Sequence, residues 1–335
     1  KYMHLTGTIK EIPVTMNLFK QAGEDPILDR YYGTYYYNQY MEPIEVSGEV
    51  ADSTGLIRLR EALTEEDVFN GFVGNFDSLG VFRGEWREGY RHFSLPFELS
   101  ESYLPGTVQL DFFDGNYVFA GDTTSENESE LMVHLSTLWP QNDYPFLENE
   151  LIKLLYGGAA SSGVSGPKDL FEQLKTGYLE EYKRTTQELT QDSVPVGNFS
   201  YDMEMFCVWN EDSMLVLGNR YYRYEGGAHG VYGVEYANLD LKARHVLALS
   251  DVFLEGFENQ LSRALESALR RKYDLRPQMD IREIVDVDKI PVTSNFYVTG
   301  GGIGFYYPPY ELGAYALGDF EFFLRFEDIE ELLKP

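Results

Sequence analysis

The residues best suited to chemistry lie in one glycine-rich segment, Glu225-Gly226-Gly227-Ala228-His229-Gly230. Its glycines permit left-handed backbone torsions and let a ligand or another chain approach the backbone closely. We therefore take Glu225, Gly227 and His229 as candidate ligand-binding residues, with His229 as a ligand or proton carrier assisted by Glu225. The alternative is a structural turn in which His229 hydrogen-bonds the backbone, and the spacing leaves both interpretations open.

A second candidate segment runs from Tyr306 to Gly318 and reads YYPPYELGAYALG. Its two prolines block continued pairing between strands, so we expect a loop that interrupts two strands. This loop would display Tyr310, Glu311 and Tyr315, and tyrosine beside a carboxylate is typical of recognition surfaces. In the alternative interpretation the tyrosines pack against the edge of a sheet and Glu311 caps local backbone.

Other patterns for catalysis or metal binding are weak. The chain has no phosphate-binding loop, no dinucleotide fingerprint, no nucleophile elbow and no H-E-x-x-H sequence. Asp280, Asp286 and Asp288 lack the spacing and the glycine of an EF-hand, which favours a solvated acidic loop. We therefore predict no catalytic residue, no metal site and no cofactor. These patterns favour a binding protein over an enzyme. With 55 carboxylates in the chain, a pair at the separation that a glycoside hydrolase uses stays open as an alternative.

Cys207 is the single cysteine, so the described sequence forms no internal disulfide and no thiolate zinc site. It lies in an apolar, strand-like run between Met203 and Trp209, where a cysteine is usually a small buried hydrophobe. The neighbouring acidic residues Glu204 and Glu211 disfavour a reactive thiolate.

The elements that must position these residues fall into two groups. Residues 1–122 read as short strands separated by turn signals, which predicts an all-β meander or a small barrel. Within it, Asp114-Gly115 between two aromatic runs predicts a hairpin. The polar segment 123–130 is the expected linker.

Residues 131–335 change to mixed helix and strand. Apolar residues at helical spacing predict helices near 147–155, 170–189 and 257–269, while alternating patterns predict strands through 199–209, 215–224 and 231–241. We divide the region into a helical part, 131–200, and a sheet part, 201–335. The whole chain is therefore predicted to be α+β, with two or three helices packed on one face of an antiparallel sheet. Limited proteolysis should cut first within 121–130 or 157–166.

The net charge of the chain limits which classes of partner we expect. The chain has 27 basic and 55 acidic residues, a formal net charge of −28 at pH 7. Such a surface repels phosphate backbones and anionic lipid headgroups, which excludes nucleic acid and membrane surfaces as expected partners.

Several separate strings together resemble one family of bacterial domains of unknown function. They are the GGAHG segment, the run Leu247–Phe253, Asn295–Val298, and the stretch from Gly304 through Gly318. That domain forms the C-terminus of a lysozyme-sensing anti-sigma factor and also accompanies a peptidoglycan N-acetylmuramic acid deacetylase. The resemblance covers residues 131–335, and the whole chain is similar to envelope lipoproteins of Gram-negative bacteria.

The resemblance implies an extracytoplasmic location, periplasmic or at the outer membrane, with a lipid anchor before Lys1 as the only membrane attachment. Neither full activity carries over, since the sequence shows no membrane span and no catalytic Asp-Asp and His-x-x-x-His sites. What it implies is a non-catalytic binding or sensing module of the cell envelope. The expected ligand is a cationic protein such as a lysozyme, or a peptidoglycan fragment; a glycan-directed hydrolase is the alternative.

Overall fold

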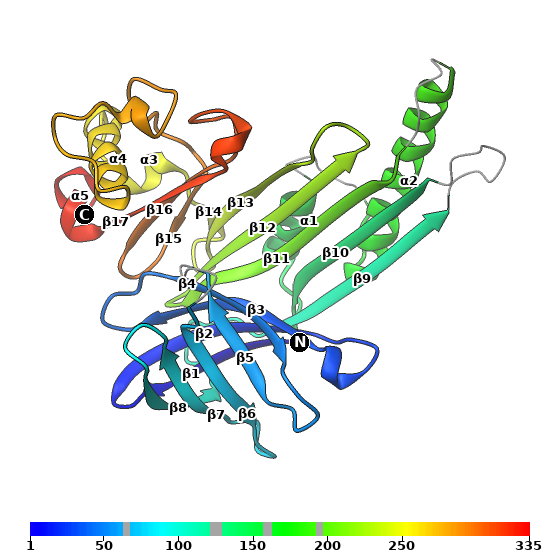
Figure 1. The fold of residues 1–335 in the computed structure, drawn as a ribbon, viewed down its shortest axis with the longest axis horizontal. Coiled ribbons are helices and arrows are strands. Elements are labelled where there is room, and N and C mark those ends of the chain that lie inside the picture. Colours follow the sequence, from blue (N-terminus) through cyan, green and yellow to red (C-terminus); the bar gives the residue numbers. More distant parts are fainter. Residues whose placement is uncertain (63–67, 121–128, 157–162, 192–196) are drawn as a thin grey trace.

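The computed structural model describes residues 1–62, 68–120, 129–156, 163–191 and 197–335. These residues form three bodies (Figure 1): a closed barrel, a six-stranded sheet with two helices, and a three-stranded sheet with a helix packed on it. The α+β class predicted from the sequence is confirmed.

The N-terminal body is an eight-stranded antiparallel barrel that closes through pairing of its first and last strands. Successive side chains along a strand point alternately into the barrel and out of it. In β5, Ile57 and Leu59 are buried, whereas Arg58 and Arg60 are exposed. The predicted meander or small barrel is thus confirmed. Its strands are β1 (Tyr2–Ile9), β2 (Ile12–Gln21), β3 (Arg30–Tyr37), β4 (Ile44–Val50), β5 (Ile57–Glu61), β6 (Gly71–Phe76), β7 (Phe82–Glu88) and β8 (Phe93–Glu101).

The second body is a sheet in the order β14-β13-β12-β11-β10-β9. Its neighbours are antiparallel except β10 and β11, which run parallel because two helices intervene between them. The strands are β9 (Leu110–Ala120), β10 (Glu130–Pro140), β11 (Phe199–Glu211), β12 (Met214–Glu225), β13 (Val231–Asp240) and β14 (His245–Val246).

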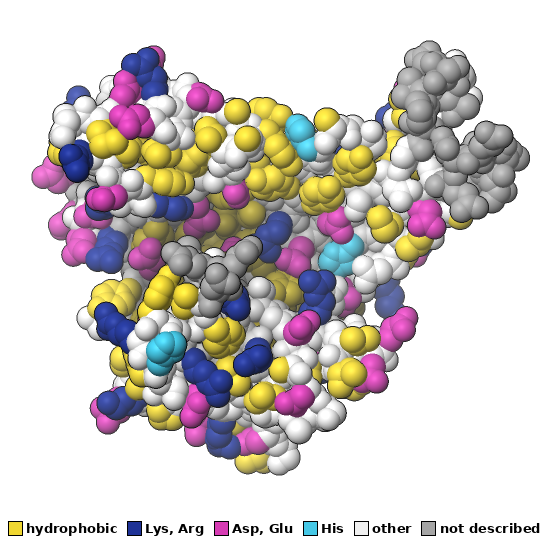
Figure 2. Space-filling model, viewed as in Figure 1, with side chains coloured by type: hydrophobic (Ala, Val, Ile, Leu, Met, Phe, Trp, Pro, Cys, Tyr) yellow, Lys and Arg dark blue, Asp and Glu magenta, His cyan; other side chains and the backbone are white. Residues whose placement is uncertain are grey.

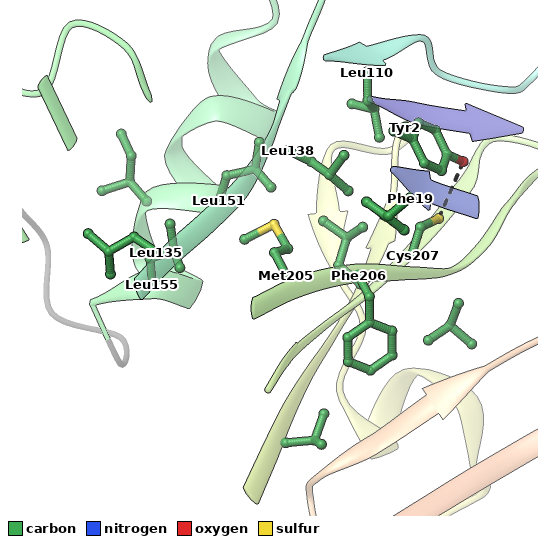
Figure 3. Close-up of a cluster of buried hydrophobic side chains, with 14 of the residues drawn as sticks. Tyr2, Phe19, Leu110, Leu135, Leu138, Leu151, Leu155, Met205, Phe206 and Cys207 are labelled. Carbon is green, nitrogen blue, oxygen red and sulfur yellow. Dashed lines mark hydrogen bonds between the residues drawn. The ribbon is translucent and has the colours of Figure 1, made fainter. Parts of the chain in front are cut away.

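Two helices cover one face of this sheet, α1 (Pro145–Leu155) and α2 (Pro167–Gln191). Each begins at a proline, which suits the first helical position because that residue needs no hydrogen-bond donor. Their apolar residues pack onto the sheet beside Leu135 and Met205, as Figure 3 shows for Leu151 and Leu155. The predicted helices on one face of the sheet are present.

One part of the predicted arrangement is wrong. Asp114-Gly115 forms no hairpin, because β9 continues through it and pairs with β10 along its whole length. A side chain at position 115 would meet the ring of Tyr117, so this glycine makes room for an aromatic neighbour instead of a turn. The last barrel strand ends at Glu101, and β9 belongs to the six-stranded sheet although the sequence groups it with residues 1–122. Residues 123–128 of the expected linker, 123–130, lie outside the described residues, and Glu130 already belongs to β10.

The third body is the sheet β15-β16-β17, with β15 (Phe296–Val298), β16 (Gly302–Tyr307) and β17 (Phe320–Arg325). The short helix α3 (Leu249–Val252) leads into α4 (Glu258–Lys272), and α5 (Phe326–Ile329) follows the sheet. Leu261, Leu265 and Leu269 of α4 are buried in the apolar core of this body, as their spacing predicts.

The barrel and the six-stranded sheet share a core. The rings of Tyr36 and Trp209 stack with centroids 4.8 Å apart, and Thr34 Oγ1 donates to the carbonyl of Cys207 at 3.0 Å. Tyr2 also reaches Cys207 across this contact (Figure 3). None of the helices in the described parts of the chain is long and apolar enough to cross a membrane.

Candidate functional site

The two segments singled out in the sequence meet in space. The turn between β12 and β13 carries His229, and the connection from β16 to β17 carries Tyr310 and Tyr315. The rings of His229 and Tyr315 stack with centroids 3.8 Å apart and an interplanar angle of 20°. Tyr310 OH lies 3.1 Å from His229 Nε2 although the two residues are 81 positions apart. We call His229, Tyr310 and Tyr315 the ring cluster.

Both nitrogens of His229 have partners. Nδ1 lies 3.0 Å from the carbonyl oxygen of Gly230, which can only accept, so Nδ1 donates. In the neutral ring Nε2 then accepts from the hydroxyl of Tyr310. The hydrogen bond to backbone is the one that the structural interpretation of this segment predicts. His229 therefore fixes the ring cluster, with one ring nitrogen held by the backbone and the other by Tyr310.

Tyr310 is held in an unusual conformation at the surface. The amide of Glu311 donates to the carbonyl of Pro308 at 3.2 Å, closing a turn with Pro309 and Tyr310 at its centre. Tyr310 takes a φ of 78°, a value that turns of this kind normally assign to glycine or asparagine. Its side chain is nonetheless 61% exposed. A strained, exposed aromatic residue of this kind is characteristic of functional loops.

The remaining predicted residues are placed as follows. The carboxylate of Glu225 accepts from Tyr201 OH at 2.5 Å and from Arg223 Nε at 2.8 Å, so it is not a partner of His229. Partial burial opposes ionisation of Glu225, but the hydrogen bonds from Tyr201 and Arg223 outweigh it and lower its pKa. The carbonyl of Gly227 accepts from Tyr224 OH at 3.1 Å.

Glu311 follows Tyr310 and is exposed. Partial burial of its carboxyl group raises its pKa. Its side chain makes no hydrogen bond or ion pair within the described residues, so its backbone amide, and not its carboxylate, holds the turn. The structure thus brings His229, Tyr310 and Tyr315 into contact, with Glu311 beside them and Glu225 separately engaged.

A larger hollow lies between the barrel and the six-stranded sheet (Figure 2), where basic, acidic and histidine side chains gather. Its volume is about 990 Å³. Arg220 crosses it in ion pairs with Glu45, at 3.0 Å, and Glu204, at 2.7 Å. Gln21 of the barrel lies 3.0 Å from His134 Nε2 of β10. These contacts hold the barrel and the six-stranded sheet together. In the sequence their only trace is the presence of polar residues on the outward faces of strands.

Across residues 1–62, 68–120, 129–156, 163–191 and 197–335, no three His, Cys, Asp or Glu side chains are grouped so that they could hold a metal ion. The arrangement around the ring cluster instead offers aromatic surface, one hydroxyl and one carboxylate, which are groups for recognition.

Comparisons with known proteins were made for both sequence and fold. A crystal structure of a DUF3298 family member from Bacteroides fragilis NCTC 9343 aligns with a TM-score of 0.59 and 22% identity, covering 68% of this chain and 95% of that chain. A DUF3298 family protein from Pseudomonas aeruginosa PAO1 aligns with a TM-score of 0.49 and 18% identity, covering 69% of this chain and 97% of that chain. No curated protein matches the chain.

The first of these structures shows a shared fold. At the level of sequence, residues 250–327 match the family described as "Protein of unknown function (DUF3298)". The match includes Tyr310 and Tyr315 but begins after His229, so the ring cluster joins this region to the preceding sheet. Residues 250–327 of the chain therefore form a DUF3298 domain.

Proposed function

We propose that the protein is a non-catalytic binding or sensing module of the bacterial cell envelope. The observation that supports this most is the ring cluster, in which two segments far apart in sequence fix an exposed tyrosine in a strained turn. Maintaining a residue outside its preferred backbone region costs on the order of 1–3 kcal/mol, and such positions are concentrated at ligand-contacting sites. His229 is held by the backbone through one nitrogen and holds the hydroxyl of Tyr310 with the other, so its role in this proposal is to position Tyr310.

The partner that we propose for this site is a cationic protein. A net charge of −28 accelerates encounter with cationic molecules through long-range attraction. Tyr310 and Tyr315 would then provide apolar contact, and Glu311 a carboxylate for a Lys or Arg of the partner. A lysozyme fits this description, since lysozymes are commonly basic, and the similarity to the lysozyme-sensing anti-sigma factor points the same way. A peptidoglycan fragment is the second ligand class that the family resemblance implies.

The location we propose is extracytoplasmic, with the protein tethered by a lipid anchor as a periplasmic or outer-membrane lipoprotein. The basis is the resemblance to envelope lipoproteins. Fractionation of cells that express the full-length gene product tests it: recovery with the membrane or periplasmic fraction is expected, and recovery in the cytosol would refute it.

Binding can be distinguished from hydrolysis by measuring, on one sample, how much ligand the protein retains and how much glycan it cleaves. The protein is immobilised and exposed to solubilised peptidoglycan fragments and to a basic lysozyme inactivated at its active site. We expect retention of one of them with no increase in reducing ends or free amino groups over hours. Release of new reducing ends in proportion to the amount of protein would instead establish the glycan-directed hydrolase.

A further inference from the structure

A separate pocket opens between the two helices and the six-stranded sheet. It has a volume of about 450 Å³ and is lined by residues of α1, α2, β11, β12 and β13. This volume lies within the range of about 300–1,000 Å³ that small-molecule sites occupy. Gly177 lies at its border inside α2, and a side chain added there would meet nothing within 4 Å. A glycine inside a helix costs about 1 kcal/mol relative to alanine, and here its effect is to leave the pocket open.

Tyrosine rings form the walls and are fixed in place. The rings of Tyr178 and Tyr201 stack with centroids 4.3 Å apart, and Tyr178 OH lies 3.0 Å from the sulfur of Met203. Tyr221 of β12 lies against Gly233 of β13, where any side chain would meet its ring. Rings locked by packing lose little freedom when a ligand binds, which favours affinity.

Two acceptor groups of the pocket have no hydrogen-bond donor among the described residues. Asn219 is 1% exposed and its amide nitrogen donates to the carbonyl of Leu154 at 3.2 Å, but its Oδ1 has no hydrogen-bond partner. Glu235 lies opposite Asn219 in the register of β12 and β13, and its carboxylate has no hydrogen bond or ion pair among the described residues. Both groups are acceptors. Asn219 Oδ1 is buried, and a buried acceptor without a donor costs about 1–3 kcal/mol, whereas Glu235 is exposed at the edge of the pocket. A ligand that supplies a hydrogen-bond donor would fit both groups.

The charge of the pocket specifies the donor further. Glu181, Asp202 and Glu235 line it, and Arg223 is the only cation among the lining residues. Arg223 is already held by Glu181 at 2.9 Å and by Glu225 at 2.5 Å, so it does not compensate Glu235. Tyrosine faces and an uncompensated carboxylate favour a cation with an apolar side. An acidic ligand would be repelled.

We propose that this pocket binds an amino sugar. Its protonated amine would pair with Glu235, its hydroxyl groups would donate to the remaining acceptors, and the C–H face of its ring would pack on the tyrosines. The proposal goes beyond the protein-binding function assigned to the ring cluster, because none of its residues belongs to that cluster.

Calorimetric titration of the full chain with three β-1,4-linked tetramers tests the proposal: glucosamine, N-acetylglucosamine and glucose. We expect the glucosamine tetramer to bind at least 10-fold more tightly than the other two. Glu235→Gln keeps the shape but removes the charge, and should weaken that binding about 10-fold. Glu180→Gln removes the same charge from the exposed side of α2 and should leave it unchanged.

Filling the mouth supplies a second test. Gly177→Leu should abolish binding, whereas Thr176→Leu, which adds the same side chain one position away and outside the pocket, should not. Equal binding of the three tetramers, equal effects of Glu235→Gln and Glu180→Gln, or no binding at all would overturn the proposal. The ring cluster is intact in all these variants, so they should leave lysozyme binding through that cluster unchanged, and failure of one proposal can be told from failure of the other.

Discussion

At the scale of single residues, the burial and the reactivity of Cys207 follow from its local sequence. Its apolar flanks predict a small buried hydrophobe, and in the structure it lies fully buried in the core, with Tyr2 OH 3.6 Å from its sulfur. Burial raises the pKa of the Cys207 thiol to about 12. The thiolate, which is the reactive form, is therefore nearly absent at neutral pH.

From this we predict that Cys207 resists alkylation in the folded protein. Iodoacetamide at pH 8 should leave it unmodified for hours, while the same reagent in denaturant should modify it within minutes. Mass spectrometry of both samples checks this. Rapid modification of the folded protein would contradict the burial described above.

Glu321 carries a second residue-scale consequence. It accepts from Tyr297 OH at 2.6 Å, and burial, opposed by this hydrogen bond and reinforced by Glu45, raises its pKa from 4.5 to about 7. The folded state thus binds this proton more tightly than the unfolded chain does. Its stability is expected to fall as the pH rises from about 4.5 to about 7, because the unfolded state then gains the favourable ionisation.

The corresponding prediction concerns Glu321→Gln, which imitates the protonated carboxyl. At pH 8 it should raise the free energy of unfolding by up to about 3 kcal/mol, and near pH 4.5 it should change little. Urea unfolding at both pH values measures the difference, with the exposed Glu331→Gln as a control. A variant that destabilises the protein at pH 8 would show that the carboxylate is needed in its charged form.

Only part of the candidate site could be read from residue types. Unusual composition identified His229, Tyr310 and Tyr315, which the structure brings together. The sequence could not show that Glu225 pairs with Arg223 and Tyr201, because that depends on the register between β11 and β12. Asn219 and Glu235 have no distinctive local sequence, and only the pairing of β12 with β13 places them opposite each other.

At the scale of elements, β13 and β15 are joined by side chains and not by a continuous ladder. Asn238 of β13 donates from its Nδ2 to the carbonyl of Phe296 at 2.8 Å and accepts from the amide of Val298 at 2.7 Å. The side chain of Asn238 therefore makes the hydrogen bonds to the backbone of β15 that a neighbouring strand would otherwise make. Asn295 makes the reciprocal pair with the backbone of β13.

Removal of this link should be costly. Asn238→Ala leaves one buried donor and one buried acceptor without partners, at about 1–3 kcal/mol each, so we predict a loss of about 2–4 kcal/mol in the free energy of unfolding. Chemical denaturation followed by fluorescence measures it, with the exposed Asn142→Ala as a control. A loss below about 0.5 kcal/mol would mean that Asn238 is not a structural link.

Most individual elements follow from periodicity, and the exception is instructive. The helices α1, α2 and α4 lie where apolar spacing places them, since burial of one face is what stabilises a helix in a folded protein. At Asp114-Gly115, by contrast, the tertiary pairing of β9 with β10 overrides the local turn preference. A turn signal is a weak preference compared with a full ladder of hydrogen bonds to an 11-residue partner strand.

At the scale of the whole molecule, the contact between bodies is the feature that sequence could not supply. The barrel and the α+β class follow from strand and helix patterns, but the packing of Tyr36 on Trp209 joins residues far apart in the chain. The same holds for the hollow crossed by Arg220 and for the ring cluster, each built by two bodies. Of these contacts, the ring cluster holds the exposed loop that the proposed partner would meet.

The most direct test of the binding account is a calorimetric titration with a basic lysozyme at about 0.15 M salt, where exposed charges more than about 8 Å apart are largely screened. Tyr310→Ala and Glu311→Ala remove the two proposed contacts, and Tyr90→Ala and Glu11→Ala remove an exposed tyrosine and an exposed glutamate of the barrel as matched controls. The account predicts binding that each site variant weakens about 10-fold, or about 1.4 kcal/mol, and that neither control changes. Binding that vanishes at this salt concentration, or that site and control variants affect equally, would contradict it.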